Sequence, residues 1–349
     1  MSDTTAPNRE AVGPPGSGGG GGGGRRGLRG GLGIFARQRE ATVLVVVVAL
    51  LLYFSLSYPS TFVSKTNFVS LLSETAAPII IIGIGEVLLL ICGEIDLSVG
   101  FIYQLSPFIM YFLIAYYHVP AWLAIIASLV MGLVAGWVNA FITITLGVPS
   151  FITTLGTGFI LNGIVLTTSH AEPVNIPTQA LNIGKWIGSD SWSQIIWAVA
   201  LAAIFWVVLD RTRWGLHTVA AGGNLLGSRE AGIHVGRIKY GNFMITGVLG
   251  ALVGLQVAFY TQTIDPTAGG YTPMFYAVAA AVIGGTAMLG GQGTIIGAVL
   301  GAMVIATVTD GFNIAGVSAS PQPIIFGAAI LIAMIVNVRL ARLRAAGRA

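Results

Sequence analysis

Three acidic residues lie in or beside an apolar stretch in the first third of the chain. Glu86 falls inside the stretch, and Glu94 and Asp96 fall in the segment 93–100, which begins and ends with glycine. An ionised carboxylate in hydrocarbon is costly, so such side chains usually face a cavity or a partner. For the segment two interpretations stay open: a broken helix that offers carboxylates and free backbone groups to a polyol, or a short turn in which Asp96 and Ser98 cap a helix. For Glu86 the alternatives are a buried contact between helices and a place on a substrate path.

Residue patterns for catalysis or for binding ATP are absent from the sequence. A phosphate-binding loop needs Gly-Lys-Ser/Thr, and none of Lys65, Lys185 and Lys239 stands in that pattern. The four histidines lack the spacing of a metal site, and no Gly-x-Ser-x-Gly nucleophile motif occurs. We therefore expect no catalytic residue, no metal ion and no cofactor, and we predict that the chain is not an enzyme. Energy for transport then has to come from a partner or from an ion gradient.

The composition indicates that the solvent of this chain is largely lipid. Hydrophobic residues make up 55% of its 349 residues and charged residues 9%. A soluble domain carries roughly 25% charged residues, so these values exclude a soluble enzyme, a nucleic-acid-binding domain and a disordered chain. Long apolar runs such as 41–52 favour helices over the alternating strands of a membrane barrel. The predicted class is an all-α polytopic protein embedded in the lipid bilayer, with no nucleic-acid partner.

The apolar domain, 41–338, has room for about ten transmembrane helices of about 20 residues each. Broken or re-entrant segments are expected at 93–100 and at a second glycine cluster near residue 290, because glycine allows sharp turns. The expected spans are 41–58, 76–93, 101–117, 121–146, 150–168, 192–209, 241–261, 274–290, 294–310 and 322–338.

The segments outside these spans differ in charge. Residues 1–40 hold an uninterrupted glycine run and several arginines, and we expect a disordered cytoplasmic tail. Basic residues gather there, in the loop 210–240 and in the basic tail 339–349, whereas only two lysines fall on the other side. The positive-inside rule then places both termini and this loop in the cytoplasm. The loop is either a docking site for a partner protein or a solvated loop that only fixes topology.

Glycines in the later spans stand at spacings that let helix backbones approach closely. Glycines four residues apart occur in the fourth, seventh and ninth spans. They would allow close helix contacts either within the bundle or at a subunit interface. The close-packing positions of the later cluster are Gly284, Gly285, Gly290, Gly291, Gly293 and Gly297.

Three stretches together resemble the membrane subunit of ABC importers for ribose, xylose, galactose and related sugars. The segment 93–100 is similar to the family motif Gly-Gly-Ile-Asp-Leu-Ser-Val-Gly, with Glu94 in place of the second glycine. The segment 148–157, Val-Pro-Ser-Phe-Ile-Thr-Thr-Leu-Gly-Thr, resembles the opening of the family's fifth span, and 278–301 resembles its late segment. The likeness covers about 68–338, and the order and spacing of the three stretches make the set specific.

The resemblance implies a permease subunit in the plasma membrane for a monosaccharide or related polyol. An extracellular or periplasmic sugar-binding protein would deliver the substrate, and a cytoplasmic ABC ATPase would drive two membrane subunits, the second being a copy or a paralogue of this chain. The family's coupling loop resembles this chain at Gly222, Gly223, Asn224, Arg229 and Gly232. The expected substrate path contains Glu86, Gly93, Glu94, Asp96, Ser98, Gly100, Asn139, Asn162, Gln256 and Asp310, although hydrogen bonding between helices is an equal alternative for the last four.

Two other functions stay open. An ion-coupled secondary transporter would use Glu86, Glu94 and Asp96 as proton or cation sites. A membrane scaffold would recruit a partner through the loop 210–240 without transporting a solute.

Overall fold

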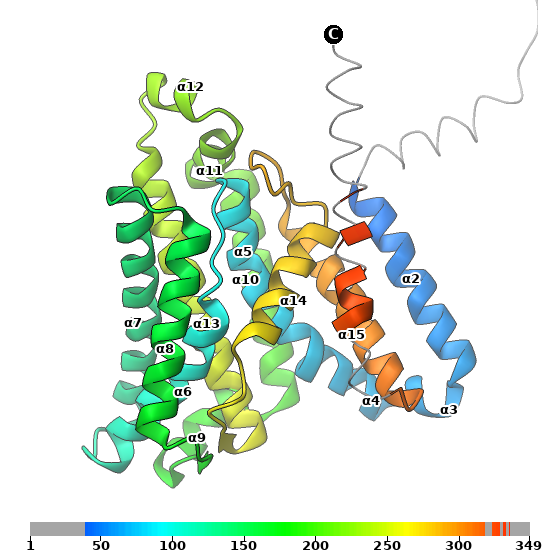
Figure 1. Cartoon of the computed structure of the whole chain (residues 1–349). Coiled ribbons are helices and arrows are strands. Elements are labelled where there is room, and N and C mark those ends of the chain that lie inside the picture. The colour runs from blue at the N-terminus through cyan, green and yellow to red at the C-terminus, as the bar shows by residue number, and fades with distance from the viewer. Residues whose placement is uncertain (1–38, 318–322, 329–330, 333–334, 336–349) are drawn as a thin grey trace, which may run out of the picture. The chain divides into compact units, whose positions relative to one another are not determined.

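The computed structural model describes residues 39–317, 323–328, 331–332 and 335. The expected tail 339–349, most of the tail 1–40 and much of the tenth span, 322–338, lie outside these residues. Figure 1 shows a bundle of helices. In chain order they are α2 (Arg39–Ser57), α3 (Pro59–Phe62), α4 (Lys65–Ser70), α5 (Ala77–Ile91), α6 (Val99–Ala115), α7 (Ala121–Ala140), α8 (Ser150–Ser169), α9 (Leu181–Gly184), α10 (Ser191–Arg211), α11 (Arg213–Gly223), α12 (Leu225–Glu230), α13 (Val235–Thr261), α14 (Tyr271–Ile283) and α15 (Ile295–Ile314).

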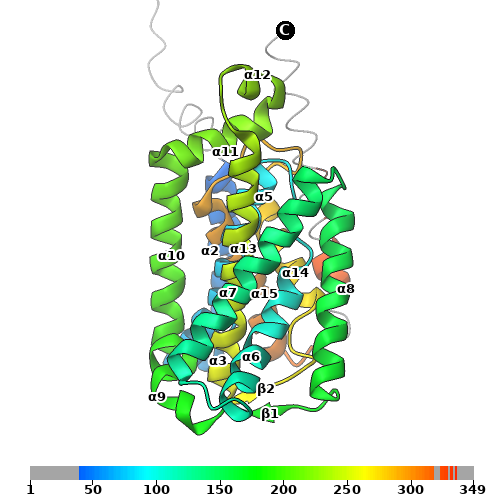
Figure 2. The same cartoon turned by 90° about the vertical axis from the view of Figure 1, so that its left-hand side faces the viewer.

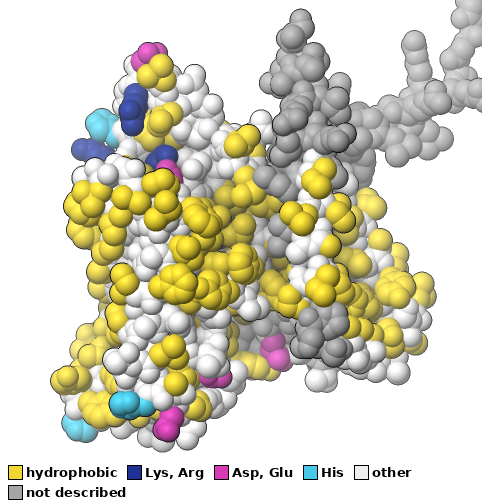
Figure 3. Space-filling model, viewed as in Figure 1, with side chains coloured by type: hydrophobic (Ala, Val, Ile, Leu, Met, Phe, Trp, Pro, Cys, Tyr) yellow, Lys and Arg dark blue, Asp and Glu magenta, His cyan; other side chains and the backbone are white. Residues whose placement is uncertain are grey.

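In the described part of the chain, seven helices are long and apolar enough to cross a membrane. One is continuous from Lys65 to Ile91, because a π-helical turn, Leu71–Ala76, joins α4 to α5. The others contain α2, α7, α8, α10, α13 and α15, whereas α6 and α14 are apolar but shorter. Figure 3 shows apolar side chains over the middle of one face and charged side chains toward its two ends. The predicted all-α, multi-pass class is confirmed.

Helix α13 forms the centre of the bundle and packs against α5, α6 and α7 (Figure 2). In the most apolar 18-residue stretch of α13, 72% of the residues are buried, whereas in that of α10, at the periphery, 22% are buried. Glycine makes the close approach possible: a Cβ atom on Gly132 of α7 would lie 2.4 Å from the carbonyl oxygen of Gly247. A Cβ atom on Gly254 would lie 2.0 Å from the carbonyl oxygen of Tyr103 in α6. These four-residue glycine steps therefore serve contacts inside the bundle.

Helices α6 and α14 begin part-way along the length of the bundle and run in opposite directions (Figure 1). The chain reaches each of them through a non-helical segment. Their N-termini meet: the Gly270 N–H donates to the Gly100 carbonyl at 2.8 Å. The rings of Phe101 and Tyr271 pack edge to face with centroids 5.1 Å apart. Irregular backbone is tolerated at membrane depth when protein surrounds it, and here each start lies against the other.

Three expected boundaries are wrong. The second span was expected from residue 76, whereas its helix is continuous from Lys65. The eighth span was expected at 274–290, with a turn allowed by its glycine cluster; α14 ends earlier, at Ile283, and the chain is non-helical to Thr294. Gly285, Gly290 and Gly291 take positive φ values there, a conformation that only glycine adopts without strain. The seventh span was expected from residue 241, whereas α13 begins at Val235.

The bundle has two ends, which we name by their elements. At the α12 end, the expected loop 210–240 contains two helices: Thr212 caps α11 by accepting from the Gly215 N–H, and Asn224 caps α12 by accepting from the Gly227 N–H. At the β end, the strands β1 (Val174–Asn175) and β2 (Thr263–Ile264) pair antiparallel.

Candidate functional site

A cluster of four fully buried polar side chains lies where the chain leaves α5 and enters α6. Asp96 and Ser98 come from the connecting segment, Glu86 from α5 and Asn139 from α7, and all four are 0% exposed. The Ser98 N–H and hydroxyl donate to Asp96 Oδ1 at 2.8 and 2.6 Å. The Asn139 amide donates to both Asp96 oxygens at 3.3 Å and to Ser98 Oγ at 2.7 Å.

The local sequence explains how these groups come together. Helix α5 ends at Ile91, and Gly93 turns the chain with a φ of +79°. The segment then runs back along the bundle, so that the Asp96 N–H faces Glu86 Oε2 at 3.5 Å. Asp96 therefore lies in the non-helical break between α5 and α6, and it accepts from the N–H of Ser98, the residue directly before α6. The break is confirmed, whereas the offer of its groups to a polyol stays a prediction.

Glu94 does not join this cluster. Its carboxylate pairs with the ammonium of Lys239 on α13, and both side chains are mostly buried. The next residue, Ile95, donates its N–H to Ser150 Oγ of α8 at 3.4 Å. Lys239 was not predicted as the partner of Glu94, although it is the single lysine of the segment 210–240 and so the clearest available partner for an acid at that end.

A second junction lies at the α12 end, where three backbone segments touch. The Gly291 N–H donates to the carbonyl of Ile91, the last residue of α5, at 2.7 Å. A Cβ atom on Gly222 of α11 would lie 1.7 Å from that same carbonyl oxygen. A Cβ atom on Gly290 would lie 2.9 Å from the Gly222 carbonyl oxygen. The junction therefore links α11 to the end of α5 and to the segment after α14 without a side chain at the contact.

The other residues predicted for coupling lie just beyond this junction. Gly223 faces more open space, since its nearest contact would be 3.8 Å from a Cβ atom. Asn224 caps α12, and Arg229 is exposed on it. Gly232, with a φ of +77°, turns the chain toward α13. Leu225 and Leu226, exposed by 44% and 69%, add an apolar surface to α12 that the predicted set did not contain.

The remaining predicted path residues are dispersed. Gln256 is fully buried on α13, and neither of its amide atoms has a partner among the described residues. Asn162 is half-buried on α8. Asp310 accepts from Asn67 Nδ2 at 2.8 Å, in the region of α4 and α15. Gln104, which was not predicted, is buried and donates to the Pro266 carbonyl.

The later glycines lie mainly in helix contacts and turns. Gly284 and Gly297 face each other across α14 and α15, since a Cβ atom on either would lie within 2.2 Å of the other's carbonyl oxygen. Gly293 lies against the side chains of Ile91 and Thr286.

Comparison with known proteins assigns the family. A family model described as branched-chain amino acid transport system, permease component, matches residues 68–335. The chain belongs to this permease family. The permease is 35% identical to the xylose/arabinose import permease of Sulfolobus acidocaldarius, over 84% of this chain and 82% of that protein. It is 31% identical to the ribose import permease of Escherichia coli K12, over 86% and 93%. It is 30% identical to the autoinducer 2 import permease of Photorhabdus luminescens, over 88% and 92%.

These relatives confirm the predicted resemblance to permeases of sugar ABC importers. No solved structure matches the permease. The three stretches that carry the resemblance converge in its fold. The segment 93–100 contacts the start of α8 through Ser150, and the segment 278–301 contacts the end of α5 through Gly291.

Proposed function

We propose that the permease is the membrane-spanning subunit of an ATP-driven importer for a monosaccharide or related polyol. The observation that carries this proposal is its similarity, over more than four fifths of the chain, to import permeases whose names specify xylose, arabinose and ribose. Membership of a permease family supports transport without catalysis in this chain, with ATP hydrolysis on a partner.

The α12 end is the proposed docking surface for the cytoplasmic ATPase. Arg229 presents an exposed positive charge, and Leu225 and Leu226 present apolar surface beside it. Gly222 lies behind this surface, in direct contact with the end of α5. A movement imposed on α11 and α12 is therefore transmitted to the end of α5, from which the chain runs to the start of α6. It is also transmitted to the segment that follows α14.

The proposed substrate path passes the starts of α6 and α14. Glu86, Asp96, Ser98 and Asn139 lie at the entry to α6, and the contact between Gly100 and Gly270 joins the two starts. Opening this contact would expose backbone groups and side-chain oxygens suited to sugar hydroxyls. A binding protein outside the cell would deliver the sugar, and a second permease subunit, identical or similar, would complete the pathway. About ten spans with both termini in the cytoplasm complete the proposed topology.

Reconstituted vesicles test this function. The permease, with the ATPase and binding protein that co-purify with it, is expected to take up a radiolabelled pentose or hexose only when ATP reaches the ATPase. An uncoupler that collapses the proton gradient is expected to leave uptake unchanged. Uptake by the permease alone, abolished by the uncoupler, would instead establish the ion-coupled transporter. No uptake of any sugar with all partners present would support the scaffold.

A further inference from the structure

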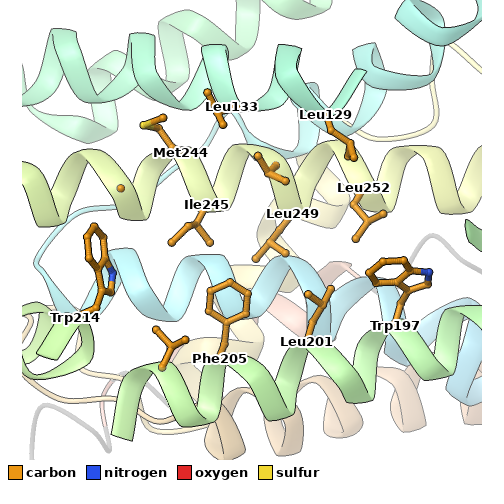
Figure 4. Close-up of a pocket in the computed structure, with 13 residues that line it drawn as sticks. Leu129, Leu133, Trp197, Leu201, Phe205, Trp214, Met244, Ile245, Leu249 and Leu252 are labelled. Carbon is orange, nitrogen blue, oxygen red and sulfur yellow. The ribbon is translucent and has the colours of Figure 1, made fainter. Parts of the chain in front are cut away.

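An apolar groove of about 630 Å³ lies between α7 and α10, with α13 as its floor (Figure 4). Leu129 and Leu133 of α7 form one wall and Leu201 and Phe205 of α10 the other. All three helices are among those long and apolar enough to cross a membrane. The groove therefore lies at the depth of the bilayer's hydrocarbon.

Tryptophans mark the two ends of the groove (Figure 4). The Trp214 indole N–H donates to Asn242 Oδ1 at 2.9 Å, and the Trp197 indole N–H donates to the Trp186 carbonyl at 3.0 Å. Both donors are satisfied by the protein, so the rings contribute only apolar surface to the groove. From Trp197 to Val208, α10 rises by about 16 Å, close to the half-thickness of about 15 Å that one leaflet's acyl chains occupy.

Three arginines flank the Trp214 end of this groove. Arg211 lies one turn beyond the lining residue Val208 of α10, and Arg237 lies one turn before the lining residue Gly241 of α13. Arg213 directly precedes Trp214. All three are exposed, and none forms an ion pair within the described part of the chain. Asp210, the nearest acid in sequence, points to the opposite side of α10 by helical periodicity.

We propose that this groove binds one anionic phospholipid, with an acyl chain along α10 and α13 and the phosphate at Arg211, Arg213 and Arg237. An acyl chain matches the length and the apolar lining, and a bilayer supplies it at this depth. Guanidinium groups bind phosphate oxygens in a bidentate geometry. The positive-inside rule places these arginines at the cytoplasmic leaflet, where anionic lipids attract basic side chains. The proposal does not depend on the identity of the transported solute.

Native mass spectrometry of the full permease, exchanged into phosphatidylglycerol or phosphatidylcholine, tests the site. The wild-type chain is expected to retain phosphatidylglycerol in preference to phosphatidylcholine. Arg211→Gln, Arg213→Gln and Arg237→Gln together are expected to weaken that binding on the order of a hundredfold, because each arginine near an anionic surface contributes several-fold. The matched pair is Arg211→Gln and Arg229→Gln, which each remove one positive charge: the first is expected to weaken binding several-fold, and the second, on α12, is expected to bind phosphatidylglycerol like the wild type.

A second pair of variants tests the acyl chain. Leu201→Trp fills the groove and is expected to displace the lipid, whereas Val199→Trp, on the exposed opposite face of α10, is expected to retain it. Wild-type retention by both the triple variant and Leu201→Trp would overturn the proposal. Three other outcomes would also overturn it. Equal retention of phosphatidylcholine would indicate an ordinary annular lipid, and displacement by inorganic phosphate alone would indicate a free anion. A disulfide between two copies carrying Leu201→Cys would indicate that a second copy of the chain covers the groove.

Discussion

Asp96 receives hydrogen bonds from the backbone N–H and hydroxyl of Ser98 and from the amide of Asn139. The side chain is fully buried, so these donors replace the water that it lost on folding. Its two oxygens tie the segment before α6 to α7. This carboxylate therefore holds the residues directly before α6 against α7.

We expect Asp96→Asn to lower both stability and ATP-dependent uptake. The new amide keeps one oxygen but places a donor opposite the Asn139 donor, and leaving buried polar groups unpaired costs about 1–3 kcal/mol. Thermal unfolding in detergent and uptake in vesicles measure the two effects. Ser106→Ala is the control, because it removes another buried hydrogen bond, from Ser106 to the Ala251 carbonyl, outside the proposed path. If uptake by Asp96→Asn equals that of the wild type, Asp96 acts only as a helix cap.

The ion pair between Glu94 and Lys239 gives a second prediction. Glu94→Gly, which restores the residue that the family motif usually carries, is expected to destabilise the permease by about 1–3 kcal/mol, because it leaves a mostly buried ammonium donor without its partner. Lys239→Met alone is expected to cost a similar amount.

The double variant is expected to be more stable than the sum of the two single losses predicts. A double-mutant cycle on thermal unfolding measures the difference. Strictly additive losses would show that the two charges do not interact.

That Asp96 faces polar partners was predictable from the sequence, but the identity of those partners was not. An acid beside glycines at the end of an apolar run indicates a site on physical grounds alone. Asn139 is 43 positions away, and only the packing of α7 against α6 and α13 brings it to Asp96. The dispersal of Asn162, Gln256 and Asp310 has the same cause, because a polar residue in an apolar run does not reveal which neighbour its helix face meets.

At the scale of elements, the junction of α11 with α5 makes a prediction about coupling. Gly222→Ala places a methyl group against the Ile91 carbonyl, where a Cβ atom would lie 1.7 Å away, so α11 has to move from α5. We expect the variant to bind the ATPase but to lose most sugar uptake, with ATP hydrolysis retained. The ratio of sugar transported to ATP hydrolysed measures this loss.

Gly223→Ala is the matched control for that variant. It adds the same methyl group one residue later, where the nearest atom would be 3.8 Å away, and it is expected to keep the wild-type ratio. Equal ratios for Gly222→Ala and the wild type would show that coupling does not pass through this contact. Equal losses in both variants would assign the effect to a general sensitivity of α11.

The elements themselves were largely predictable, because long apolar runs specify membrane helices by length. The exception is α14 (Tyr271–Ile283), which is shorter than the expected span 274–290. The end of α14 was misjudged since apolar residues continue past Ile283, whereas the positive φ values of Gly285, Gly290 and Gly291 end the helix. A count of hydrophobic residues does not detect backbone conformation.

For the whole molecule, the distribution of basic residues predicts which end faces the cytoplasm. Leu226→Cys at the α12 end and Lys185→Cys in the π-helical turn before α10 test it, because the single native cysteine, Cys92, is buried. In intact cells, a membrane-impermeant maleimide is expected to label Lys185→Cys and not Leu226→Cys. Permeabilised cells are expected to show labelling of both. Labelling of Leu226→Cys in intact cells would invert the topology and remove the proposed contact with an ATPase.

The meeting of α6 and α14 start to start has an electrostatic consequence. Each helix carries about half a positive elementary charge at its N-terminus, so two such partial charges converge inside the bundle beside the contact from Gly270 to Gly100. Asp96 and Glu86 lie beside the start of α6, so positive helix ends and acidic side chains face the same region of the bundle. A neutral polyol, whose hydroxyls both donate and accept hydrogen bonds, can pair with both kinds of group.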